Sequence, residues 1–416
     1  MIPKRNSEHS DVSRRGFVAG TAGVVAASGF PSPTAASGTL SVMTRNLAAG
    51  VELFDLDGAS SLADVRQTAG QLFVDLRRYP VAPRAEAIAA EIDATSPDVV
   101  GLQEAMLVRT RRPSNFQNNP APSASDVVVD FLDALSAALA ERGLEYEVAT
   151  SQVTTDIEVP ADVDEERIDV RLTDRVAVLV QADTEIIGTS GDTFEAARSV
   201  SVGGLTADIN RGYCTVDVSL DDVDVTVAST HLEPSEASSR RRQAGELVES
   251  LPTDRPVLLA GDFNSGPGAE TDTYESLIES FSDAHTTLRP TADGYTCCQD
   301  DDLTNDESQL SRRVDAVLYR GGANPTAIER VGAATDDRVS LDDESVTLWP
   351  SDHAGVVATF EIDSTVDPEA ATPSNGSEQE SDDRLTGFGI VGTITALLVV
   401  VLRQGGRGDG DHETDD

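Results

Sequence analysis

The feature that most constrains the fold of this chain is a series of short apolar segments that each border polar residues. The segments are four or five residues long, rich in Val, Leu and Ala, and bounded by Gly, Asp or Asn, as buried strands are. They predict strands at residues 40–43, 99–102, 176–180, 225–229, 257–260, 314–318 and 356–360. Between them, longer segments predict helices at residues 84–94, 127–142, 236–250 and 273–280.

This mixture of strands and helices extends over one region, residues 39–363. In the predicted helix 127–142, positions 128, 131, 132, 135 and 139 are apolar and form one stripe that can face a core. The region contains no internal repeat that would indicate a solenoid or propeller. We therefore expect two packed sheets covered by helices.

Acidic residues dominate the charge of the chain, with 73 Asp and Glu against 31 Lys and Arg and a net charge of −42. The apolar patterning excludes a disordered acidic chain, and the spread of the acids from Asp55 to Asp363 excludes a single acidic tail. We interpret the chain as a halophile's protein, because a solvated acidic surface stays soluble in molar salt, where the Debye length is about 3 Å. The charge disfavours ordinary nucleic-acid binding through Lys and Arg, but salt screening weakens this argument and leaves nucleic acid open.

The first residues resemble an export signal. Arg14 and Arg15 precede an apolar, Gly- and Ala-rich run, and small residues follow near position 36. This order is typical of a twin-arginine signal peptide, which we place at residues 1–38. The alternative is a chance Arg pair before an apolar stretch.

The C-terminal residues predict a tether. Residues 364–384 are rich in acids, Ser, Thr and Pro, which is typical of a linker. Residues 385–416 contain an uncharged, largely apolar run followed by a polar tail. This run predicts a membrane anchor, or it resembles the sorting signals of haloarchaeal surface proteins, in which a lipid replaces the removed tail. In that signal a Pro stands where this chain has Thr386. We expect an exported protein at the cell surface, anchored by membrane segment or lipid, or released.

The three cysteines, Cys214, Cys297 and Cys298, are too few for a zinc site built from paired Cys-x-x-Cys motifs. Three states remain open for them. Cys214 could bond to one of the pair, the pair could bond to each other, or all three could be reduced and buried.

Polar residues at the borders of the predicted strands are the candidates for chemistry. They are Asn46, Gln103, Glu104, His231, Asp262, Asn264, Asp315, Asp352 and His353. Because strand ends converge in layered folds, we expect these side chains to meet. Each has a simpler interpretation: an Asx turn at Asp262, a helix cap at Glu104, or a surface pair of Arg313 with Asp315.

This ordered set of motifs resembles the endonuclease/exonuclease/phosphatase superfamily of deoxyribonucleases, sphingomyelinases and inositol phosphatases, in a secreted haloarchaeal form. The resemblance covers about residues 39–362. It implies an α/β (mixed α+β) fold, a four-layer sandwich of two mixed β-sheets flanked by helices. It also implies a monomeric hydrolase that cleaves phosphodiester or phosphomonoester bonds by metal-assisted, in-line attack of water.

The resemblance assigns a metal site to Asn46, Glu104 and Asp352. Mg²⁺, or Mn²⁺ in its place, suits these hard oxygen ligands, because Mg²⁺ keeps several waters and needs only one or two carboxylates.

The resemblance assigns catalytic roles to five residues. Asp262 would orient or deprotonate the attacking water, and Asn264 would donate to the phosphate. His353, oriented by Asp315, would contact a phosphoryl oxygen or accept a proton. His231 would stabilise the developing charge or protonate the leaving group.

The substrate stays open between nucleic acid, phospholipid and small organic phosphates. His231 in its Thr-His-Leu motif favours deoxyribonuclease-, sphingomyelinase- or inositol-phosphatase-like members over abasic-site endonucleases. Nuclease, phospholipase C or sphingomyelinase-like enzyme, and phosphatase all remain. The alternative outside enzymes is an inactive surface-binding module on the same fold.

Four further features have no assigned role. Arg175 could contact phosphate or form a salt bridge, and His285 is expected to be structural or exposed. Trp349, close to Asp352, could line the site or pack against it. The segment at residues 50–83 could form a loop on the substrate side.

Overall fold

The computed structural model describes residues 36–49, 59–78, 80–118, 121–202, 204–268, 271–341 and 346–363. The predicted linker and C-terminal segment lie outside these residues, as does the predicted signal peptide up to residue 35. Within the described residues, no helix is long and apolar enough to cross a membrane.

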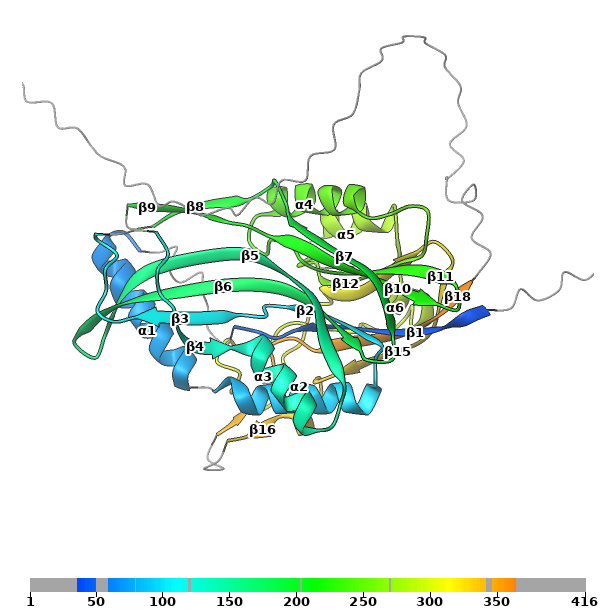
Figure 1. The fold of residues 1–416 in the computed structure, drawn as a ribbon, viewed down its shortest axis with the longest axis horizontal. Coiled ribbons are helices and arrows are strands. Elements are labelled where there is room, and N and C mark those ends of the chain that lie inside the picture. Colours follow the sequence, from blue (N-terminus) through cyan, green and yellow to red (C-terminus); the bar gives the residue numbers. More distant parts are fainter. Residues whose placement is uncertain are drawn as a thin grey trace, which may run out of the picture. The chain divides into compact units, whose positions relative to one another are not determined.

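An eight-stranded mixed sheet forms one of the two central layers (Figure 1). Its strands are β1 (Ala36–Asn46), β2 (Val99–Gln103), β3 (Leu107–Arg111), β4 (Asp126–Asp130), β5 (Tyr146–Val163), β6 (Glu166–Gln181), β15 (Ala323–Val331) and β18 (Gly355–Asp363). They are ordered β15-β18-β1-β2-β6-β3-β4, and β5 pairs with β6. The β1–β2 pair is parallel and the other pairs are antiparallel.

A six-stranded mixed sheet forms the second central layer. Its strands are β7 (Glu185–Thr193), β10 (Gly212–Leu220), β11 (Val223–His231), β12 (Val257–Asp262), β13 (Ser282–Asp283) and β14 (Asp315–Arg320), in the order β13-β14-β12-β11-β10-β7. The β11–β12 pair is parallel. Two small hairpins complete the strands: β8 (Arg198–Val202) with β9 (Leu205–Ile209), and β16 (Val339–Ser340) with β17 (Thr347–Leu348).

Helices cover the outer faces of both sheets (Figure 1). The helices of the described residues are α1 (Leu62–Arg78), α2 (Val81–Thr95), α3 (Phe131–Glu141), α4 (Ala237–Ser250), α5 (Thr271–Ile278) and α6 (Ala284–Leu288), with a 3₁₀ turn at Thr335–Asp337. α2 and α3 pack on the eight-stranded sheet, and α4 and α5 on the six-stranded sheet. The layers are therefore helix, sheet, sheet, helix, which confirms the predicted four-layer α/β sandwich.

The strand period of two sorts the apolar side chains between the layers. In β2, Val99 faces the second sheet, while its neighbour Val100 faces α2 and α3. In β12, Leu258 faces the first sheet, while Leu259 faces α4 and α5. Strands buried on both faces read as continuous apolar runs, which explains why the sequence identified these strands so readily.

All seven predicted strands overlap observed strands, with Val314 lying just before β14. The prediction of a helix over residues 127–142 is wrong at its start. Residues 127–129 are β-branched Val in β4, which pairs with β3, and the helix begins only at Phe131. Asp130 ends the strand and caps α3, because its side chain accepts from the Asp133 backbone N–H. Val128 is therefore 38% exposed and not part of the core-facing stripe.

The unassigned segment at residues 50–83 holds α1 rather than only a loop; residues 50–58 lie outside the described residues. α1 packs on the long β5–β6 hairpin through Ala69, Phe73 and Leu76. The approach is closest at Gly70, where a Cβ atom would lie 2.1 Å from the carbonyl oxygen of Asp162. Only glycine fits this crossing.

We predict opposite effects of the same substitution in two helices. Gly→Ala in an exposed helix interior stabilises by about 0.5–1 kcal/mol. Gly245→Ala in α4 should do so, because its Cβ would meet nothing within 4 Å. Gly70→Ala should instead destabilise by roughly 1–3 kcal/mol, because its Cβ overlaps a backbone carbonyl. Denaturant unfolding at fixed high salt measures both. Equal stabilisation by the two substitutions would contradict the contact between α1 and β5.

Candidate active site

The predicted site residues meet because of strand direction and register. β1 and β2 run parallel and end together at the Asn46–Gln103 pair. β11 and β12 also run parallel and end at the His231–Asp262 pair, and Asp262 faces Asp315 in the antiparallel partner β14. The ends of both sheets thus deliver polar side chains to one place.

The side chain of Asn46 joins the two sheets at this place. Its Nδ2 donates to Oε1 of Glu104 at 3.1 Å and to Oδ2 of Asp262 at 3.0 Å. Its Oδ1 accepts from the backbone N–H of Ala48. Asn46 does not line the pocket. In the structure it orients the two carboxylates, and its role as a metal ligand stays a prediction.

Glu104 lies where the chain turns sharply out of β2. Its φ of 52° is in the left-handed region, which costs a residue with a side chain on the order of 1 kcal/mol. The backbone N–H of Ala49 donates to Oε2 at 2.7 Å and helps to fix the carboxylate. Burial, together with the charges of Asp352 and Asp174, raises the pKa of Glu104 to about 7.

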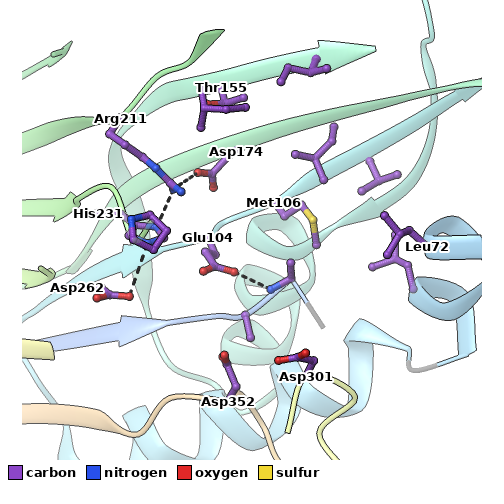
Figure 2. Close-up of a pocket in the computed structure, with 18 of the residues that line it drawn as sticks. Leu72, Glu104, Met106, Thr155, Asp174, Arg211, His231, Asp262, Asp301 and Asp352 are labelled. Atoms are coloured by element: carbon purple, nitrogen blue, oxygen red, sulfur yellow. Dashed lines mark hydrogen bonds and ion pairs between the residues drawn. The ribbon is translucent and has the colours of Figure 1, made fainter. Parts of the chain in front are cut away.

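This cluster of carboxylates fits a hard divalent cation. Glu104, Asp352 and Asp174 all line the same pocket, and their mutual repulsion disfavours three negative charges without a cation (Figure 2). Carboxylate oxygens are the ligands that Mg²⁺ and Mn²⁺ prefer. Glu104 and Asp352 therefore keep their assignment as candidate ligands. Two further groups hold potential ligand atoms within 4.8 Å of one another: Asp262–Asp315–His353 and Cys297–Cys298–His353. Both need His353, whose Nδ1 already pairs with Asp315.

His353 forms a pair with Asp315, which lies behind it. Its Nδ1 is 2.8 Å from Oδ2 of Asp315, and its Nε2 is 3.8 Å from carboxylate oxygens of Asp262 and Asp352. Burial alone would lower the pKa of His353, but the three carboxylates raise it well above the ordinary value. These carboxylates favour the protonated imidazolium form of His353, whose Nε2–H can donate to a phosphoryl oxygen.

His231 has the opposite charge state. Nη1 of Arg211 lies 3.2 Å from its Nδ1, and a guanidinium can only donate, so Nδ1 accepts and the proton is on Nε2. Burial and the charge of Arg211 hold the pKa of His231 well below its ordinary value. Neutral His231 thus points an Nε2–H into the pocket, 3.6 Å from Oδ2 of Asp262. This state suits donation to a developing charge and not protonation of a leaving group.

Asp262 lies between the two imidazoles. Burial and the neighbouring charge of Asp315 raise its pKa to about 6, so it is mostly ionised at neutral pH and can accept a proton. Its Oδ1 accepts from the backbone N–H of Asn264. The side chain of Asn264 donates to the carbonyl of Leu232 at 2.9 Å and lines the pocket.

The pocket has a volume of about 440 Å³. Six of the predicted site residues line it: Glu104, His231, Asp262, Asn264, Asp352 and His353. Asp315 and Asn46 lie behind these and position them.

Sequence reasoning missed Arg211 and Asp174. Arg211 is buried and lies 3.3 Å from Asp174 and 3.6 Å from Glu233, as well as touching His231. The one signal in the sequence was its charge, because Arg211 is a basic residue in a strongly acidic chain. Asp174 gave no such signal among so many acids.

The features left open in the sequence have structural roles. Arg175 forms an ion pair with Asp130 at 2.6 Å. His285 is buried against Arg313. Trp349 is fully buried and donates to the carbonyl of Asn305, so it does not line the pocket. Cys297 and Cys298 are bonded to each other, and Cys214 is free and buried.

Comparisons with known proteins give one family model and several solved structures that align with the chain. A model of the "Endonuclease/Exonuclease/phosphatase family" matches residues 74–353. Solved structures that align with the chain include an endonuclease/exonuclease/phosphatase family protein from Bacteroides thetaiotaomicron, with 15% sequence identity, a TM-score of 0.48, and coverage of 78% of this chain and 97% of that one. A second is a protein from Beutenbergia cavernae, with 22% identity, a TM-score of 0.47, and coverage of 78% of this chain and 72% of that one. A third is the mannosyl-6-phosphatase of Bacteroides thetaiotaomicron, with 15% identity, a TM-score of 0.47, and coverage of 77% of this chain and 99% of that one. A search of curated proteins found no match.

We predict that Glu104→Gln removes a pH-dependent destabilisation of the folded state and also removes the stabilisation of the protein by a divalent cation. The folded pKa of Glu104, about 7, lies above the ordinary value of 4.5, so the folded state binds more protons and loses stability as pH rises between these values. The variant should flatten this slope. At pH 8 it should be more stable than the wild type by about 1 kcal/mol, because removing the buried charge outweighs the loss of the acceptor for one of the two donors to Glu104.

Unfolding with and without Mg²⁺ measures both effects. Ligand binding stabilises the wild type by RT ln(1 + [L]/Kd), and Glu104→Gln should lose this gain. The exposed Glu86→Gln on α2 is the matched control and should keep it. Undiminished Mg²⁺ stabilisation in Glu104→Gln would show that Glu104 is not a ligand.

Proposed function

The chain belongs to the endonuclease/exonuclease/phosphatase family, a family of phosphoester hydrolases, and we propose that it is a metal-dependent phosphoesterase that uses this site. The observation that carries the proposal is the single polar centre in which Asn46 orients Glu104 and Asp262, and which His231 and His353 border. Every residue type that phosphoryl transfer requires is present there. No observation favours the inactive binding module.

A divalent cation bound at Glu104 and Asp352 would neutralise charge on the phosphoryl group. Asp262 orients a water molecule and takes its proton while the water oxygen bonds to phosphorus and the ester P–O bond breaks on the opposite side. The leaving oxygen keeps the electron pair of that bond and takes up a proton from solvent. His231 and the His353 imidazolium donate through Nε2–H to phosphoryl oxygens. Asp315 keeps His353 oriented and charged.

We propose further that the enzyme is exported and works in concentrated salt, as a monomer at the cell surface. The Arg14-Arg15 signal, the net charge of −42 and the apolar segment at residues 385–402 support this. Cell fractionation with Arg14→Lys and Arg15→Lys tests the export route. Unchanged export of the double variant would rule out the twin-arginine pathway.

We predict metal-dependent hydrolysis of bis-p-nitrophenyl phosphate or p-nitrophenyl phosphate by the protein in multimolar KCl. EDTA should abolish the activity, and Mg²⁺ or Mn²⁺ should restore it. Asp262→Asn and His353→Gln should each lower kcat by about 10²–10⁴-fold, because each removes a proton-transfer or charge-stabilising group.

The exposed Glu329→Gln on β15 serves as the control and should retain full activity. The preferred ester separates a diesterase from a monoesterase. Turnover that resists EDTA, or that survives both active-site substitutions, would refute the proposed mechanism.

A further inference from the structure

The pocket continues beyond the polar centre into an apolar groove. The side chains that line this groove come from α1, β5, β6, the β8–β9 hairpin and the residue before β3, and include Leu72, Met106, Ile157, Leu172, Val200 and Ile209. Figure 2 shows Leu72 and Met106 away from His231 and Asp262, with Glu104 between them. We call this part of the pocket the apolar groove.

The apolar groove is open to a ligand. Leu72, Ile157 and Leu172 are only partly buried, and all three line the pocket together with other apolar side chains. Apolar surface left in contact with water costs roughly 25 cal/mol per Å², so a ligand that covers it gains affinity. The whole pocket, at about 440 Å³, is in the range of small-molecule sites, which are mostly apolar with a few polar groups.

From this groove we infer that the substrate is a phosphate ester with an alkyl or acyl chain, whose phosphate meets the polar centre while its chain lies in the groove. This inference rests on the proposed function and names the substrate class of the same site. The substrate binds as a single molecule whose alkyl or acyl chain enters the groove, because the groove and the catalytic residues belong to one pocket and not to a flat surface.

The charges and aromatic content of the pocket disfavour a nucleic acid. Polynucleotides need cationic side chains for successive phosphates and aromatic platforms for their bases. Of the described residues that line the pocket, Phe73 is the only aromatic one, and it is 4% exposed. The arginines that line the pocket are Arg198, Arg211 and Arg312, which are few for successive phosphates. Arg211 is engaged by Asp174 and Glu233, and Arg312 contacts the sulfur atoms of the disulfide.

The groove also disfavours a sugar phosphate. A sugar needs several hydrogen-bonding groups around it, because its hydroxyls lose water on binding. The walls formed by α1, β5 and β6 present Leu72, Ile157, Val159, Val170 and Leu172 instead. An apolar chain is the ligand group that these walls accommodate.

A series of p-nitrophenyl alkyl phosphate diesters tests the inference. Methyl, butyl and octyl esters, each below its micelle concentration, share one leaving group, so only the chain differs. We expect kcat/KM to rise by up to about fourfold per methylene, which corresponds to about 0.8 kcal/mol per buried CH₂, until the groove is filled. Mainly KM should fall, since the chain binds equally in ground and transition states.

Substitutions in the apolar groove test where the alkyl chain of the substrate binds. Leu172→Gln, and independently Leu72→Gln, should lower kcat/KM for the octyl ester at least tenfold and leave the methyl ester nearly unchanged. The matched control is Ile187→Gln on β7, a side chain that is 46% exposed and does not line the pocket. It should leave both esters unchanged.

The outcomes separate this inference from the proposed function. No hydrolysis of any ester would refute the proposed function itself. Hydrolysis of all three esters at equal kcat/KM would keep the function and overturn the inference. Faster turnover of DNA than of the octyl ester would also overturn it. So would a flat ester series with turnover of phospholipid only in vesicles, which would indicate a membrane-binding surface instead.

Discussion

The rest of the structure depends on a set of buried hydrogen bonds that joins the ends of the two sheets. Asn46 binds Glu104 from its own sheet and Asp262 from the other. Below it, Nε2 of Gln103 donates to Oγ of Ser229 in β11, and that hydroxyl donates back to the carbonyl of Leu102. Buried polar groups without partners cost about 1–3 kcal/mol each, so these bonds constrain how the sheets slide and rotate against each other. A one-residue register shift would send the site side chains to the wrong face. The same hydrogen bonds therefore fix both the alignment of the two sheets and the geometry of the site.

The same centre holds two histidines in opposite charge states because their neighbours differ. His231 contacts the cation of Arg211 and stays neutral, whereas His353 lies among Asp315, Asp352 and Asp262 and carries a proton. Both direct an Nε2 atom toward Asp262. A phosphate ester placed there would meet two donors, one charged and one neutral, beside a carboxylate that can accept a proton. The carboxylates around Glu104 supply the negative charge that makes a divalent cation favourable.

The sequence predicted the layered fold and the central polar set because both follow from local patterns. Strands such as β2 and β12 are buried on both faces, so their composition alone identifies them, and the motifs follow directly after them. Arg211 and Asp174 were missed because their roles come from contacts between distant segments, which spacing does not reveal. The predicted start of α3 was wrong because Val residues fit either a strand or the apolar stripe of a helix, and the pairing of β4 with β3 decides between the two. The apolar groove could not be predicted, since it arises from the crossing of α1 over the β5–β6 hairpin.

The central claim is that the converging strand ends form one site for a divalent cation and a phosphate ester. The most direct test is anomalous diffraction from crystals of the protein soaked with Mn²⁺. The account predicts a Mn²⁺ ion bound by the carboxylate of Glu104 beside Asp352, at about 2.0–2.2 Å from its oxygen ligands, within reach of the pocket that Asp262 and His231 line. An ion at Cys297, Cys298 and His353 instead, or no ordered ion near Glu104 at saturating Mn²⁺, would contradict it.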